Sequence, residues 1–105
     1  MKSYILKDGQ PVPEPDIIRW SQWYQTTTDR QLCNDVIAEG IRVSTVFLGL
    51  DHNWGAGPPV LWEIMVFGGP MNEECDRCSG NREQAEAMHA RMVERVRGDE
   101  KFVRS

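Results

Sequence analysis

Two long runs of apolar and β-branched residues dominate the hydrophobic pattern of the chain. Residues 41–50 read Ile-Arg-Val-Ser-Thr-Val-Phe-Leu-Gly-Leu, and residues 60–67 read Val-Leu-Trp-Glu-Ile-Met-Val-Phe. Residues of this kind favour β-strands. The segment between them, 51–59, contains two Gly and two Pro and predicts a loop. We therefore expect the two runs to pair as an antiparallel hairpin with a long connection.

Shorter segments predict the remaining strands. They are residues 3–6, 10–12, 31–37 and 73–78. Asp8-Gly9 separates the first two and is a hairpin signal, because Gly readily adopts the positive φ that such turns require. Glu39-Gly40 marks another turn just before the strand at 41–50. The chain is thus expected to open with a β-hairpin and to build its main sheet from antiparallel strands.

A first helix is predicted directly after the hairpin. Pro15 and Asp16 suit a first helical turn, since Pro has the required φ and Asp meets the positive end of the helix dipole. Ile17, Trp20 and Tyr24 then recur at helical spacing and share one face. This segment is expected to pack through that face.

The C-terminal helix has the stronger signals. Asn81 can cap its free amides, and Gln84 three residues later completes a capping-box pattern. Gly98 is expected to end the helix as a C-cap. The apolar stripe of this helix comprises Ala85, Met88, His89, Met92 and Val96. Within that stripe, His89 is interpreted as a histidine at the edge of the core and not as a ligand.

These elements predict an α+β fold, with an antiparallel sheet of four to five strands and two helices in a single compact domain, residues 1–105. Trp62, Ile64 and Val66 face one side of their strand, and other large apolar groups face the opposite side. Two helices with one stripe each are expected to cover only one face. We therefore expect a homo-oligomer, a dimer or larger, held through Trp62, Ile64 and Val66.

Composition narrows the class of partner. No apolar run approaches the roughly 20 residues of a membrane span. The N-terminus lacks an apolar signal segment, so we expect a cytoplasmic protein. The net charge of −4 disfavours nucleic acid, since phosphate backbones repel an acidic chain.

The three cysteines do not predict a metal site. Cys75 and Cys78 form a CxxC that Cys33 and His52 or His89 would have to complete as a zinc site. A second closely spaced ligand pair is missing, and a strand would turn the two sulfurs to opposite faces. We expect neither metal nor cofactor.

Catalytic signals are weak. Asp51-His52 with Glu63 across the hairpin would suit acid–base chemistry, because the pKa of histidine is ordinarily near neutral. A polar loop facing one exposed carboxylate is the favoured interpretation. The motifs of serine hydrolases, phosphate loops and dinucleotide-binding folds are absent from the sequence. A non-catalytic protein is the resulting expectation.

A resemblance extends over most of the chain. It is carried by residues 42–54 and 57–70, and by the segments 4–12 and 86–93. These stretches are similar to a family of small accessory proteins encoded by tailed phages and prophages. The resemblance implies an accessory role, and such proteins often counter host immunity by sequestering a nucleotide-derived signal or by blocking a defence protein.

Two binding hypotheses follow, and one enzymatic alternative stays open. The first is capture of a nucleotide-like signal, by stacking on an aromatic ring and by arginine contacts to phosphate. Its candidate residues are His52, Trp54, Trp62, Arg42 and Arg77. The second is a protein–protein inhibitor that masks a basic site of a host defence protein with its acidic surface. The third is an enzyme that processes a nucleotide signal with His52 and Glu63.

Overall fold

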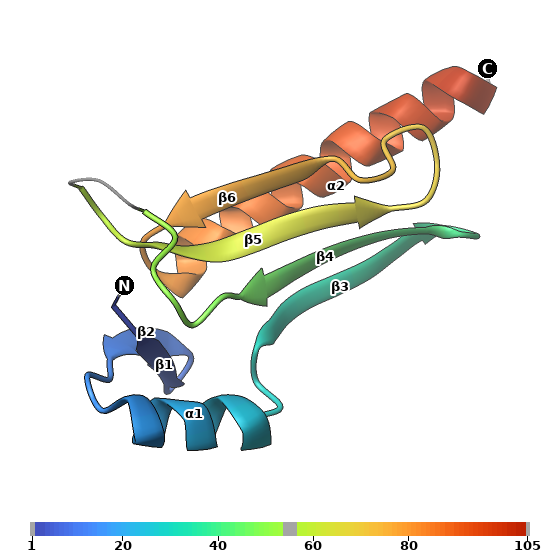
Figure 1. Cartoon of the computed structure of the whole chain (residues 1–105). Coiled ribbons are helices and arrows are strands. Elements are labelled where there is room, and N and C mark those ends of the chain that lie inside the picture. Colours follow the sequence, from blue (N-terminus) through green and yellow to red (C-terminus); the bar gives the residue numbers. More distant parts are fainter. Residues whose placement is uncertain (1, 54–56, 105) are drawn as a thin grey trace.

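A four-stranded antiparallel sheet backed by one long helix forms the body of the molecule (Figure 1). The computed structural model describes residues 2–53 and 57–104, with side chains as far as Gly98. The sheet has the order β3-β4-β5-β6, so each strand pairs with the next one along the chain. Its elements are β3 (Gln31–Ala38), β4 (Ile41–Phe47), β5 (Val60–Phe67), β6 (Cys75–Ser79) and the helix α2 (Arg82–Arg104). The α+β prediction is confirmed.

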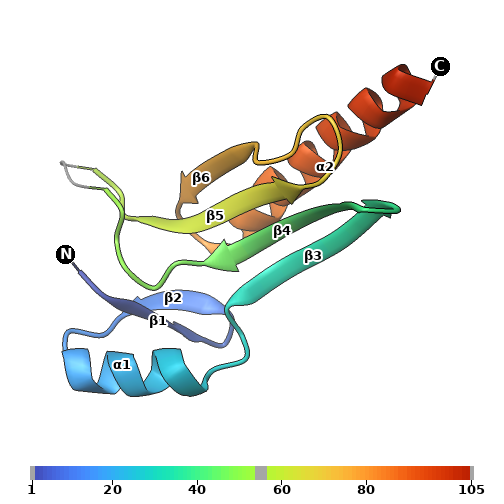
Figure 2. The ribbon, with the colours of Figure 1, turned by 45° about the vertical axis from the view of Figure 1, so that its right-hand side comes forward.

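The N-terminal residues form a separate small unit at one end of the sheet (Figures 1 and 2). It consists of β1 (Tyr4–Lys7), β2 (Gln10–Pro13) and α1 (Ile17–Thr26), with β1 and β2 in a sheet of their own. The helix begins after Asp16, whose carboxylate accepts a hydrogen bond from the Ile18 amide at 3.0 Å. The predicted hairpin and first helix are therefore both present.

Trp20 fastens this unit to the sheet. Its indole Nε1 lies 3.0 Å from the carbonyl oxygen of Tyr4 and 3.1 Å from that of Gly49, and donates to both. Gly49 has a φ of +81° and ends the predicted strand 41–50 early, at Phe47. The ring of Trp23 meets Phe47 edge-on, with centroids 5.9 Å apart, and carries the core into α1.

One face of the main sheet is covered completely by α2. Trp62, Ile64 and Val66 have no exposed surface, because the apolar stripe of the helix packs over them. The core comprises Ile41, Val43, Phe47, Leu61, Trp62, Ile64 and Val66 from the strands and Ala85, Met88, Met92, Val93 and Val96 from the helix. The prediction that Trp62, Ile64 and Val66 form the interface of an oligomer is wrong, because all three are buried within a single chain. The oligomer itself stays a prediction.

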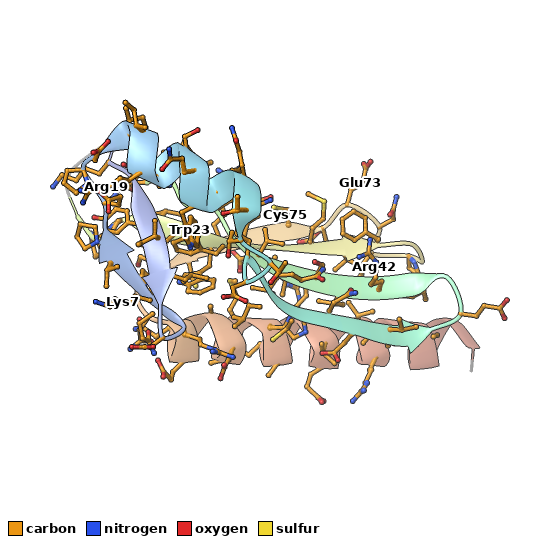
Figure 3. The ribbon with its side chains drawn as sticks, turned by 90° about the horizontal axis from the view of Figure 1, so that it is seen from below. Lys7, Arg19, Trp23, Arg42, Glu73 and Cys75 are labelled. Atoms are coloured by element: carbon orange, nitrogen blue, oxygen red, sulfur yellow. The ribbon has the colours of Figure 1, made fainter. Side chains whose placement is uncertain are left out.

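The opposite face of the sheet is open and mixed in character. Arg42 and Cys75 lie on it, on the side of the sheet away from α2 (Figure 3). The Arg42 guanidinium sits 4.5 Å from the centroid of the Phe67 ring, which is 40% exposed. An antiparallel sheet commonly keeps one face in water, and these paired polar and apolar groups fit that arrangement.

The C-terminal helix runs past the point where the sequence predicted its end. Gly98 lies inside α2, which continues to Arg104. A glycine within a helix costs about 1 kcal/mol relative to alanine, which is too little to stop a long helix by itself. In the described part of the chain, no helix is both long enough and apolar enough to span a membrane.

Candidate functional site

A groove runs between β6, at the edge of the sheet, and α2. The chain turns at Gly80, where φ is +101°, and α2 then runs back along β6 in the opposite direction. The groove encloses about 560 Å³. It is lined by Val60, Arg77, Cys78, Ser79, Gln84, Ala87 and Arg91. Small-molecule sites typically have volumes of about 300–1,000 Å³, so the groove is large enough to hold such a ligand.

The predicted capping box fixes the start of the helical wall. The Asn81 amide donates to the Gln84 side-chain oxygen at 2.9 Å, and the Gln84 amide donates to the Asn81 side-chain oxygen at 3.0 Å. A side chain at position 80 would overlap Gln84. The turn between β6 and α2 is therefore rigidly defined, and with it the position of the groove.

Two arginines line the groove, and they differ in their partners. Arg77 alternates with Cys78 on β6 and pairs with Glu63, so its guanidinium lies toward the open face of the sheet, whereas Arg91 belongs to α2. The Arg77 Nε lies 2.9 Å from a carboxylate oxygen of Glu63, which partly neutralises its charge. Arg91 has neither a hydrogen bond nor an ion pair with any residue in the described part of the chain. One turn further along α2, Arg95 reaches Glu74 at 3.7 Å. Arg91 is thus the arginine of the groove whose donors are available to a ligand.

The thiol of Cys78 lies on the side of β6 that faces α2, and it is not activated as a nucleophile. Its pKa is raised, chiefly because burial disfavours the thiolate, and the Asp76 carboxylate adds to the shift. Arg91 acts in the opposite direction without outweighing the other two. A thiol with a raised pKa is a poor nucleophile at neutral pH, so this residue serves the groove as part of its wall.

Residues 51–53 lead toward Val60, which lines the groove. The Asp51 carboxylate accepts hydrogen bonds from the amides of Asn53 at 2.8 Å and Val60 at 2.9 Å. These two bonds lower the pKa of Asp51, and the bond from the Asn53 amide has the larger effect. The amide of His52 donates to the carbonyl of Val60 at 3.0 Å, and Val60 lines the groove. His52 therefore lies beside the groove, as Arg77 does.

The other three candidate ligand residues have different positions. Trp54 lies outside the described residues. Trp62 is fully buried, and its Nε1 donates to the Gly80 carbonyl at 3.1 Å, so its ring has no face for a ligand. Arg42 lies opposite Phe67 while Arg77 lies opposite Glu63. These positions are four residues apart on β5, about 13 Å along the strand, so the two arginines do not meet.

The acid–base pair of His52 and Glu63 is not formed. Glu63 is bound to Arg77, and His52 is held beside Val60, three residues earlier on β5. The two sulfurs of the CxxC also diverge, as expected, since Cys75 pairs with Met65 on the open face and Cys78 with Trp62 on the helix side. Among the described residues, no group of three potential metal ligands comes together.

A buried polar chain joins α2 to β3 and β4. The Thr45 hydroxyl lies 2.7 Å from His89 Nδ1, and His89 Nε2 lies 2.7 Å from the Asp35 carboxylate. A carboxylate only accepts, so Nε2 carries the proton in the bond to Asp35, while Nδ1 and the Thr45 hydroxyl form the second bond. Thr45 has no exposed surface. The Thr45 hydroxyl is thus inaccessible to a substrate, and the two hydrogen bonds of His89 hold α2 against β3 and β4. The interpretation of His89 as a core residue is confirmed.

Replacing His89 by Ala is expected to lower the free energy of unfolding by about 2–4 kcal/mol, because it leaves a cavity and an unpaired buried hydroxyl. Urea denaturation measures the change. Asp35→Asn is the matched control, since the amide oxygen can still accept from Nε2 and the side chain is 57% exposed. It should lose less than about 1 kcal/mol. Equal losses in both variants would contradict the role of the Thr45 bond.

Sequence reasoning missed Arg91 as a groove residue, because at the level of sequence it belongs to a basic helix C-terminus. The signal that marks it is its spacing: Gln84, Ala87 and Arg91 fall on one flank of α2, beside the apolar stripe.

Comparison with protein-family models, with curated proteins and with solved structures found no match to this chain.

Proposed function

We propose that the protein is a non-catalytic binding protein that captures an anionic, nucleotide-derived ligand in the groove between β6 and α2. The observation that carries the proposal is Arg91, an exposed guanidinium in the groove that has no acidic partner in the described part of the chain. A guanidinium presents its donors in a planar fork that matches phosphate oxygens. An arginine left without a carboxylate inside a groove is suited to an anion from solution.

The rest of the lining supports a ligand with both charged and apolar parts. Arg77 lines the groove as a residue of β6, while its guanidinium is bound to Glu63 on the open face. The Ser79 hydroxyl and the side-chain amide of Gln84 add neutral donors, while Val60 and Ala87 supply apolar surface. Phosphate groups would lie against Arg91, and the sugar or base would lie against the apolar surface of Val60 and Ala87.

This function agrees with the setting implied by the resemblance to phage accessory proteins. A protein that binds a nucleotide signal without altering it lowers the free concentration of that signal in proportion to its own amount. No catalytic group is needed for such a role. The raised pKa of Cys78 and the engagement of Glu63 with Arg77 both favour binding over turnover.

Replacing Arg91 by Gln is expected to weaken binding of an ADP-ribose derivative or a cyclic dinucleotide by about 10- to 150-fold, the range for loss of a charged hydrogen-bonding group. Isothermal titration calorimetry against both ligand classes, with inorganic phosphate as a reference, measures the change. Arg95→Gln is the matched control, because Arg95 lies one turn away and already faces Glu74. It should leave the affinity within about threefold.

The results distinguish nucleotide capture from the protein inhibitor and from the enzyme. An absence of heat with every nucleotide would reject the proposal, and a stoichiometric host protein bound to the chain would then favour the inhibitor. Chromatography of the ligand after incubation distinguishes capture from catalysis, because capture returns the ligand intact. Equal losses of affinity in the Arg91 and Arg95 variants would place the ligand outside this groove.

A further inference from the structure

A row of three side chains crosses the open face of the main sheet, at the end away from the N-terminal unit (Figure 1). Arg42 of β4 pairs with Val36 of β3 on one side and with Phe67 of β5 on the other. Directly opposed residues of antiparallel strands share one face, so a guanidinium stands here between two apolar side chains. Figure 3 shows Arg42 on the side of the sheet away from α2. The row therefore lies outside the core that α2 covers.

The two apolar members of the row are exposed to solvent. Val36 is 70% exposed and Phe67 is 40% exposed. Among the residues with described side chains, the other exposed large hydrophobic residues, Ile17 and Ile18, belong to α1. A ligand that covered Val36 and Phe67 would remove their apolar surface from water, which is favourable. The row thus favours a ligand with an apolar body.

Arg42 has no acidic partner among the described residues. Its one hydrogen bond within that part of the chain runs from Nη1 to the side-chain oxygen of Asn34, at a long 3.4 Å. The guanidinium carbon lies 4.5 Å from the centroid of the Phe67 ring. A guanidinium that lies over an aromatic ring keeps the donors along its edge for other partners. Those donors form a planar fork that matches the two oxygens of a carboxylate.

A cavity of about 340 Å³ adjoins the row, at the lower end of the size range of small-molecule sites. The turns at Gly40 and Gly68 close one end of it and are packed together, since a methyl group at position 68 would overlap the Gly40 carbonyl oxygen. The register of β3 and β4 shifts between Val36 and Ala38, beside the cavity. Such irregularities re-aim side chains and are frequent next to active sites. The lining comprises Val36, Gly40, Ile41, Arg42, Phe67 and Gly68.

The lining of this cavity suits a single negative charge. Among the described residues that form it, Arg42 alone is charged. The Gly68 amide already donates to the side-chain oxygen of Asn72 at 2.7 Å, so it is not available to a ligand. A phosphate monoester carries close to two negative charges at neutral pH, which one guanidinium does not balance. A carboxylate carries one charge and offers two oxygens to the fork of Arg42.

We propose that this cavity is a second binding site, which holds a small monocarboxylate with an apolar body. The carboxylate lies along the edge of the Arg42 guanidinium, and the apolar body covers Phe67 and Val36. The site is separate from the groove between β6 and α2. Phe67 lies seven positions after Val60 on β5, about 23 Å along the strand, and Arg42 lies on the side of the sheet away from α2 (Figure 3). A negative result at one of the two sites therefore does not count against the other.

Nuclear magnetic resonance titrations test the site with benzoate, acetate and benzamide as probes. Benzoate should bind saturably with a Kd of about 1 mM, because a ligand of so few atoms gains little beyond one charged contact. The amide signals of Gly40 and Gly68 should be among those that shift. Acetate lacks the apolar body and benzamide lacks the charge, so each should bind at least about tenfold more weakly than benzoate. This comparison uses the unaltered protein and does not depend on the folding of a variant.

Arg42→Gln should weaken benzoate binding by about 10- to 150-fold, the range for loss of a charged hydrogen-bonding group. Arg19→Gln is the matched control, because the Arg19 side chain is 76% exposed on α1 and faces Asp16 at 3.7 Å. It should leave the affinity within about threefold. An absence of saturable shifts with benzoate overturns the proposal, and so does acetate or benzamide binding as tight as that of benzoate. Equal affinities in the Arg42 and Arg19 variants overturn it as well, since the carboxylate would then lie elsewhere.

Discussion

Replacing Trp62 by Ala is expected to lower the free energy of unfolding by about 3–5 kcal/mol, at the upper end for large-to-small core changes. Trp62 is fully buried beneath α2, and its ring meets Phe47 edge-on with centroids 5.0 Å apart. The substitution also removes the bond from Nε1 to the Gly80 carbonyl, which leaves the turn before α2 without its partner. Urea denaturation followed by tryptophan fluorescence and circular dichroism measures the loss.

Phe67→Ala is the matched control on the same strand. Phe67 points to the open face and is 40% exposed, so its truncation should cost about 1 kcal/mol or less. Comparable losses at both positions would contradict the assignment of one covered and one open face. A folded Trp62→Ala protein that merely changes its mass in light scattering would contradict it as well, since the effect would then lie in assembly.

Replacing Gly68 by Ala is expected to destabilise the fold by about 2–5 kcal/mol, from unfavourable backbone conformation and overpacking together. Gly68 has a φ of +86°, a region that residues with a side chain rarely adopt. A methyl group there would also overlap the carbonyl oxygen of Gly40, in the turn between β3 and β4. To remove this overlap, one of the two backbone turns would have to move, and both turns are fixed by the strands that they connect.

Gly40→Ala separates the two causes. Gly40 has a comparable φ of +77°, but no atom of the described residues lies within 4 Å of the position that its methyl group would take. This variant should therefore lose only the conformational part, about 1–2 kcal/mol. Thermal unfolding of both proteins measures the difference. A Gly40→Ala variant as unstable as Gly68→Ala would show that close backbone packing between the turns is unimportant.

The sequence is informative about elements whose signals are local. The β-branched runs predict β4 and β5, Asp8-Gly9 predicts the first hairpin, and Asn81 with Gln84 predicts the start of α2. Each of these signals acts over a few residues and needs no tertiary contact. The end of α2 was mispredicted for the same reason. A single Gly98 is a weak stop signal, and α2 continues beyond it.

Features that depend on contacts between helices and strands could not be predicted from local sequence signals. β5 has large apolar residues on both faces, so its pattern does not say which face α2 covers. The choice depends on the turn at Gly80, which returns the helix along β6. That same turn brings Arg91 of α2 alongside β6 and creates the groove. The aromatic residue Trp62 looked available for stacking because burial is a property of the whole fold.

The order of the main sheet has a consequence for how the chain folds. Because β3, β4, β5 and β6 pair in the order in which they are synthesised, most contacts of the sheet join near neighbours in sequence. Low contact order of this kind shortens the search for the native topology. Longer-range contacts join α2 to β3, through Asp35 and His89, and the N-terminal unit to distant segments, through Tyr4 to Gly49 and Gln10 to Arg82. These closures carry the larger loop entropy, so the sheet is the part of the chain that can nucleate, and α2 and the N-terminal unit dock onto it afterwards.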